Sequence, residues 1–157
     1  LKKYGYNAIR SAHNPTSAAT LEACDRLGML VMDEYVDMWY IHKNKYDYAS
    51  QFAEEWQNDL KALVERDYNH PCVIMYSTGN EVAETGQKKG IAFARQMTDY
   101  IHTMDDRPVT CGINIFFNLL YSLASAYTAI KRPITPPRRP KRRSLSAANF
   151  STTLRAF

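Results

Sequence analysis

"CVIMYSTGNEVAE", residues 72–84, is the stretch that decides the fold. An uninterrupted apolar run, Val73 to Tyr76, stops abruptly at Gly79-Asn80-Glu81. A short apolar run bounded in this way is typical of a buried strand, and continuous apolarity favours a parallel sheet over an antiparallel one. The sequence therefore predicts a buried parallel strand with an amide and a carboxylate at its carboxyl end.

Strands and helices alternate on both sides of this stretch. Expected strands span 6–10, 29–32 (ending at Asp33-Glu34) and 109–111, and expected helices span about 16–27, 51–68 and 88–104. Continuous apolarity in 29–32 predicts a strand buried on both faces. Repeated β-α units predict an α/β fold, either a doubly wound sheet or a barrel, and the lack of a Gly-rich phosphate loop weakens the dinucleotide-binding option.

Polar residues follow each of the first three strands. Arg10 and His13 follow the first strand, Asp33-Glu34 the second and Asn80-Glu81 the third. The carboxyl ends of parallel strands share one face, where the active sites of barrels lie. We therefore expect these side chains to meet in one cleft.

Two longer segments carry a family resemblance. "YGYNAIRSAHNPTSAATLEACDRLGMLVMDEYVDMW" (4–39) and "RDYNHPCVIMYSTGNE" (66–81) resemble the catalytic barrel of glycoside hydrolase family 2, over about residues 1–121. The resemblance implies part of a (β/α)8 TIM barrel, about four β/α units. It also implies a retaining hydrolase that cleaves β-linked galactosides or related sugars.

The resemblance also implies roles for individual residues. Glu81 matches the general acid/base, Asn80 the residue that hydrogen-bonds the sugar 2-hydroxyl, and Arg10 and His13 match positions that line the sugar site. Further candidates are Asp33 and Glu34 as supporting acids, and Asp37 and Trp39 in the loop 35–50 as substrate-binding residues. Trp39 could stack on a sugar ring or simply pack within the loop. This loop departs from the large β-galactosidases that bind magnesium there, so we expect neither a metal site nor another cofactor.

A second catalytic carboxylate is missing from the chain. Retaining glycosidases need a nucleophile in addition to the acid/base, and no Asp or Glu follows Asp106. We expect the chain to be inactive alone; a carbohydrate-binding remnant without chemistry is the alternative. Half a barrel also exposes sheet edges, which predicts self-association.

The last part of the chain differs in composition. Residues 1–130 contain 12 basic and 16 acidic residues, whereas 131–157 contain eight basic and none acidic. We interpret 1–122 as the partial barrel and 123–157 as a disordered basic tail, of a kind that an altered reading frame would produce. Less favoured alternatives are nucleic-acid binding through Arg138–Arg143 and a membrane span over 113–130.

Cysteines and histidines add little to the functional prediction. Cys24, Cys72 and Cys111 lie far apart without a metal-ligand spacing, which indicates buried free thiols in a reducing, cytoplasmic compartment. His70 precedes a proline and is interpreted as structural. His42 and His102 carry no motif. The start at Leu1, without Met or a signal-peptide pattern, indicates a piece of a longer protein.

Overall fold

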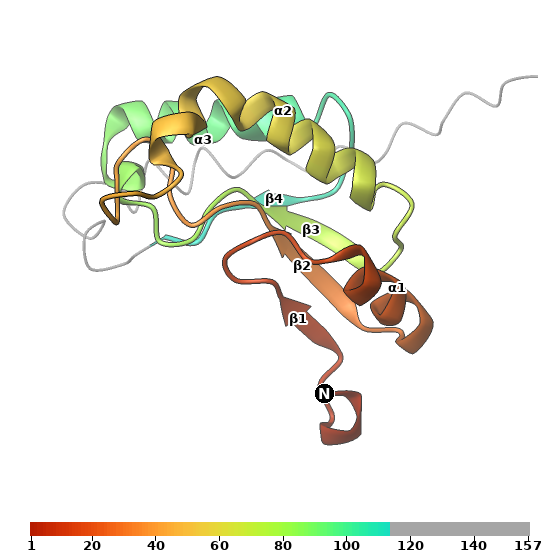
Figure 1. Cartoon of the computed structure of the whole chain (residues 1–157). Helices are drawn as coiled ribbons and strands as arrows, with labels where there is room; N and C mark the ends of the chain where they lie inside the picture. The colour runs from red at the N-terminus through yellow and green to blue at the C-terminus, as the bar shows by residue number, and fades with distance from the viewer. Residues whose placement is uncertain (114–157) are drawn as a thin grey trace, which may run out of the picture.

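The computed structural model of the chain describes residues 1–113, which form one parallel sheet with helices along it (Figure 1). The four strands are β1 (Ala8–Arg10), β2 (Leu30–Glu34), β3 (Val73–Ser77) and β4 (Val109–Thr110). They lie side by side in the order β1-β2-β3-β4, and each neighbouring pair is parallel. All four predicted strands are confirmed.

Three α-helices connect the strands, and all of them were predicted. They are α1 (Ala18–Leu27), α2 (Ala49–Asp67) and α3 (Lys88–Ile101). Two short 3-10 helices, η1 (Lys2–Tyr4) and η2 (Ala83–Gly86), were not predicted. The Ser17 side chain accepts a hydrogen bond from the Thr20 amide at the start of α1, and Gly28 ends this helix at a φ of 64°, in the left-handed region that glycine adopts easily.

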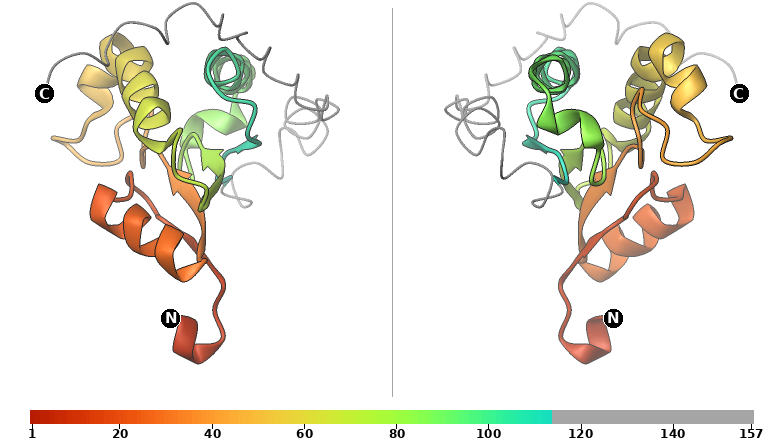
Figure 2. Two further views of the ribbon diagram at one scale, coloured as in Figure 1. Left: turned by 90° about the vertical axis from the view of Figure 1, so that its right-hand side faces the viewer. Right: turned by 90° about the vertical axis from the view of Figure 1, so that its left-hand side faces the viewer.

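The helices and the sheet share one hydrophobic core. Leu21 of α1, Val31 of β2, Phe52 of α2 and Met97 of α3 belong to the same buried cluster and have no exposed surface. The helices therefore cover one side of the sheet, as Figures 1 and 2 show. A doubly wound sheet reverses its strand order and carries helices on both faces, so this arrangement is that of a (β/α)8 barrel in part.

The other side of the sheet is open, which corrects one prediction. Val31 and Asp33 of β2 are buried, but Leu30 is 41% exposed and Met32 is half-buried. Ile74 of β3 is likewise 42% exposed. The strands are therefore not buried on both faces, because within residues 1–113 all the helices pack on the same side.

Two predictions lie outside the described residues. The basic tail at 123–157 and nearly all of the possible membrane span at 113–130 fall there. Among the helices of residues 1–113, none has the length and apolar character needed to cross a bilayer.

Candidate active site

The carboxyl ends of β1, β2 and β3 place an arginine, a glutamate and an asparagine in contact. Arg10, the last residue of β1, donates to both carboxylate oxygens of Glu34 at 2.8–3.0 Å, from Nε and Nη2. Its Nη2 also donates to Oδ1 of Asn80 at 2.7 Å. This pairing gives the guanidinium one defined orientation at the strand ends.

Glu34 is fully buried and its charge is compensated. Besides the two-pronged pair with Arg10, its Oε2 accepts a hydrogen bond of 2.6 Å from the hydroxyl of Ser77, the residue opposite it on β3. Its backbone amide donates to the Ser11 hydroxyl at 2.9 Å. A buried carboxylate needs such hydrogen-bond partners, and the Glu34 carboxylate in turn holds the Arg10 guanidinium in place. Glu34 thus holds Arg10 without reaching the surface of the site.

Asn80 is held from both ends of its amide group. Oδ1 accepts from Arg10, and Nδ2 donates to Oδ1 of Asp37 at 2.8 Å. Lys43 donates to the same Asp37 oxygen and to the backbone carbonyl of Asn80, both at 2.8 Å. These contacts orient the amide and set its oxygen toward Arg10.

Asp37 stays ionised in this network. Partial burial alone would raise the pKa of its carboxyl, but the hydrogen bonds from Lys43 and Asn80 outweigh burial and hold the pKa below its usual range. The exposed His13 also lies near enough to lower it further when protonated. Asp37 and His13 therefore belong to the same cluster as Asn80.

Glu81 follows Asn80 on the open side of the site. It is exposed and has a φ of 47°, an uncommon value for a residue with a side chain. Residues in such conformations cluster at active sites, where the surrounding structure holds them.

Trp39 packs beneath the turn that contains Glu81 and supports its conformation. Its complete burial disagrees with the predicted stacking on a sugar ring. The indole has no exposed surface, and its Nε1 donates to the Thr78 carbonyl at 2.9 Å. It packs so closely on Gly79 that a Cβ there would lie 2.9 Å from Nε1. Phe93 of α3 contacts it edge-on, with ring centroids 5.7 Å apart. Trp39 is thus a packing residue beneath the Gly79-Asn80-Glu81 turn and presents no face to a ligand.

Asp33 also lies away from the predicted cleft. It is fully buried, and its Oδ1 accepts from the Ser11 hydroxyl and from both the amide and the hydroxyl of Thr16. Its Oδ2 accepts from Arg66 of α2. Successive residues of a strand point to opposite faces, so Asp33 points toward the helices when Glu34 points toward Arg10. It ties the loop after β1 to α2.

Sequence reasoning missed Lys43 and Ser77. The register of β2 and β3 places Ser77 opposite Glu34, so an alignment of the strands would have found it. Lys43 comes from the middle of the long loop after β2, and no periodic pattern there indicates where its side chain reaches.

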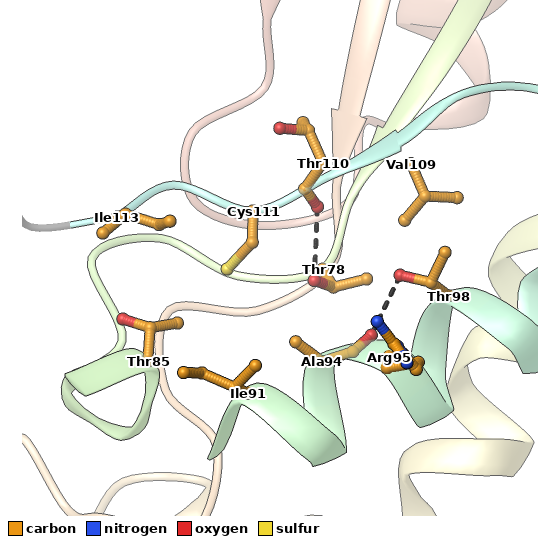
Figure 3. Close-up of a pocket in the computed structure, with 10 residues that line it drawn as sticks. All are labelled: Thr78, Thr85, Ile91, Ala94, Arg95, Thr98, Val109, Thr110, Cys111 and Ile113. Carbon is orange, nitrogen blue, oxygen red and sulfur yellow. Dashed lines mark hydrogen bonds between the residues drawn. The ribbon is translucent and has the colours of Figure 1, made fainter. Parts of the chain in front are cut away.

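Two hollows lie near these residues. A cavity of about 30 Å³ lies between α3 and the ends of β3 and β4, and Figure 3 shows Cys111 beside it. This volume suits a single water molecule and not a sugar. A wider cleft of about 650 Å³ adjoins Asp37 and runs between the loop after β1 and helix α2.

The three cysteines were predicted to be buried free thiols, and two of them are buried. Cys24 and Cys72 are buried, Cys111 is half-buried, and all three are free. Burial raises the pKa of the Cys72 and Cys111 thiols to about 12.

The structure is thus a parallel partial barrel with an arginine, a buried glutamate and an Asn-Glu pair at its strand ends. The family model that describes the TIM barrel domain of glycosyl hydrolases family 2 matches residues 1–135 of the sequence. The chain therefore belongs to this family.

Known relatives agree with this assignment. The chain is 50% identical over 84 residues to the beta-galactosidase BoGH2A of Bacteroides ovatus. The aligned residues make up 54% of this chain and 10% of that protein. It is 31% identical over 137 residues to a beta-glucuronidase of Paenibacillus borealis, covering 76% of this chain and 23% of that protein. A crystal structure of a family 2 member from Bacteroides cellulosilyticus superimposes with a TM-score of 0.73 at 43% identity, covering 82% of this chain and 16% of the other. The chain thus spans a small part of the length of each relative.

Proposed function

We propose that this chain carries the acid/base half of a retaining β-glycosidase site that acts on β-galactosides or related sugars. One observation carries the proposal: the Arg10–Asn80 hydrogen bond of 2.7 Å holds the amide directly before Glu81 at the open strand ends. This amide-carboxylate pair is the one that the family resemblance matches to substrate binding and proton transfer.

In this proposal each side chain has a defined task. Glu81 gives a proton to the glycosidic oxygen and later takes one from the attacking water. One hydrogen of the Asn80 amide group is directed to Asp37, and the second is available for a sugar hydroxyl. Arg10 and Lys43 keep Asn80 in place during both steps.

Catalysis by the chain alone is not expected. A retaining mechanism needs two carboxyl groups about 5–5.5 Å apart. Glu34 is fully buried and paired with Arg10, so it is not available as a nucleophile. Purified chain should not hydrolyse an aryl β-galactoside or β-glucuronide. Turnover that disappears in Glu81→Gln would show that the chain holds a complete site.

Sugar binding tests the rest of the proposal, and also the alternative of a binding module without chemistry. Methyl β-galactoside at millimolar concentration should shift the backbone amide signals of Asn80, Glu81 and Arg10 in nuclear magnetic resonance spectra. Asn80→Ala should abolish these shifts, whereas Asn58→Ala, on the exposed side of α2, should keep them. Shifts that persist in Asn80→Ala would place the sugar elsewhere.

A further inference from the structure

A second cluster of side chains lies at the opposite end of the sheet. Asp25 is in the last turn of α1, and His70 and Cys72 are in the segment that leads from α2 into β3. One ligating atom from each residue lies within 4.8 Å of the other two. These residues precede β2 and β3, so the cluster is at the amino ends of the strands, away from Asn80 and Glu81.

The carboxylate of Asp25 is the centre of this cluster. Its Oδ2 lies 2.6 Å from Nδ1 of His70, and its Oδ1 accepts from the backbone amide of Cys72 at 2.9 Å. The Cys72 thiol donates to the Leu21 carbonyl at 3.5 Å, and its Sγ lies within 4.8 Å of the ligating atoms of Asp25 and His70. An imidazole and a thiol, both of them metal-ligating groups, therefore lie beside the Asp25 carboxylate.

We propose that Asp25, His70 and Cys72 bind a zinc-like divalent cation at the point where their ligating atoms converge. A thiolate, a carboxylate and a neutral imidazole carry two negative charges, which a divalent cation neutralises. Thiolate together with imidazole selects borderline-soft metals such as zinc over magnesium or calcium.

The geometry needs small adjustments only. Zinc bonds of about 2.0–2.3 Å put tetrahedral ligand atoms roughly 3.4–3.6 Å apart. The Asp25–His70 contact of 2.6 Å must therefore open by about 0.8 Å, and no other separation has to close by more than about 1.2 Å, which side-chain rotation can supply. The bond from the Cys72 amide anchors Oδ1 and leaves Oδ2 for the metal, as outer hydrogen bonds commonly do in metal sites.

The site is also accessible from solvent. The Asp25 and His70 side chains are 23% and 19% exposed, while Cys72 is buried. A cation can thus enter from the surface and keep a water as its fourth ligand. Bound there, it would link α1 to the segment before β3. This inference does not rest on the proposed glycosidase function.

Cobalt(II) titration of the reduced, chelator-treated chain is the test, because a cobalt-thiolate bond gives a charge-transfer band. We expect one equivalent of Co²⁺ to produce this band and Zn²⁺ to remove it by displacement. Cys72→Ser should abolish the band, and His70→Gln should weaken Co²⁺ binding about tenfold or more while the band persists at saturation. Cys111→Ser and Cys24→Ser should leave the band unchanged.

Other outcomes would overturn the assignment. These are no charge-transfer band in the wild-type chain, a band that survives Cys72→Ser, or a band lost in Cys24→Ser or Cys111→Ser. Far-UV circular dichroism of each variant establishes that helix content is kept. The wild-type band should disappear in urea, and a band that persists there would show binding to unfolded cysteines instead. If Cys72→Ser does not fold, unchanged affinity in His70→Gln overturns the proposal.

Discussion

Asp67, the last residue of α2, makes stability depend on pH. Its side chain has no exposed surface; Oδ1 accepts a hydrogen bond of 2.7 Å from Nε of Arg66, and Oδ2 has no hydrogen-bond partner. Burial, reinforced by the neighbouring Asp33 and opposed by Arg66, raises the pKa of Asp67 from 3.8 to about 7. Two buried carboxylates share one arginine here.

The size of the effect follows from this pKa. A rise from 3.8 to about 7 is roughly three units at 1.36 kcal/mol each, or about 4 kcal/mol. The folded-state pKa is the higher one, so the protonated side chain is favoured by folding. The contribution of Asp67 is thus fully present below pH 3.8, is lost as the pH rises toward 7, and stays lost above it.

Asp67→Asn removes this titration. An amide keeps the bond from Arg66 through its oxygen but buries an N–H group, which costs about 1–3 kcal/mol at every pH. The free energy of unfolding of the variant and of wild type should be measured in urea from pH 4.5 to 8. The difference between them, variant minus wild type, should rise by about 3–4 kcal/mol over this range. The exposed Asp106→Asn should follow wild type. If Asp67→Asn keeps the wild-type pH dependence, the buried Asp67 carboxyl is not its source.

Three further substitutions test how the site is supported, each by urea unfolding. Gly90→Ala should lower the free energy of unfolding by about 1–3 kcal/mol, because a Cβ at this position would lie 1.8 Å from a carbonyl oxygen of η2. This loss should exceed the gain from the better helix propensity of alanine, and a variant as stable as wild type would contradict the prediction. Arg10→Met should cost about 3 kcal/mol because Glu34 stays buried without its cation, and adding Glu34→Met should recover most of the loss; additive losses would exclude the coupling. Trp39→Phe should lower the free energy of unfolding by about 1–3 kcal/mol, because the buried Thr78 carbonyl loses its hydrogen bond from the indole. An unchanged free energy of unfolding would show that this hydrogen bond does not stabilise the fold.

Short bounded apolar runs and helical spacing were enough to predict every strand and α-helix of residues 1–113. The apolar spacing in α2 places Phe52, Trp56, Leu60, Leu63 and Val64 on one side, and all five are buried. The short η1 and η2 were missed because three or four residues give too little periodic signal. Burial of both faces of β2 was wrong, because a strand sequence carries no information on which neighbours are present.

The site was predictable where it depends on strand ends and unpredictable where it depends on loops. Arg10, Glu34 and Asn80 meet because parallel strands bring their carboxyl ends together, which is a rule of topology. Trp39 and Lys43 come from one irregular loop; the first turned inward to pack and the second reached Asn80. Nothing in the local sequence distinguishes these outcomes, since both depend on contacts with a segment some forty residues later.

Within residues 1–113, the contacts that orient Asn80 come from the ends of the strands and the loops that follow them. Arg10 ends β1, Asp37 and Lys43 follow β2, and Trp39 packs beneath the turn after β3. Gly112, after β4, approaches Arg10 so closely that a Cβ there would lie 3.1 Å from Nη2. The orientation of Asn80 is therefore supported by contacts from within residues 1–113. Under the proposed function, sugar binding at Asn80 would therefore be separable from hydrolysis in this chain.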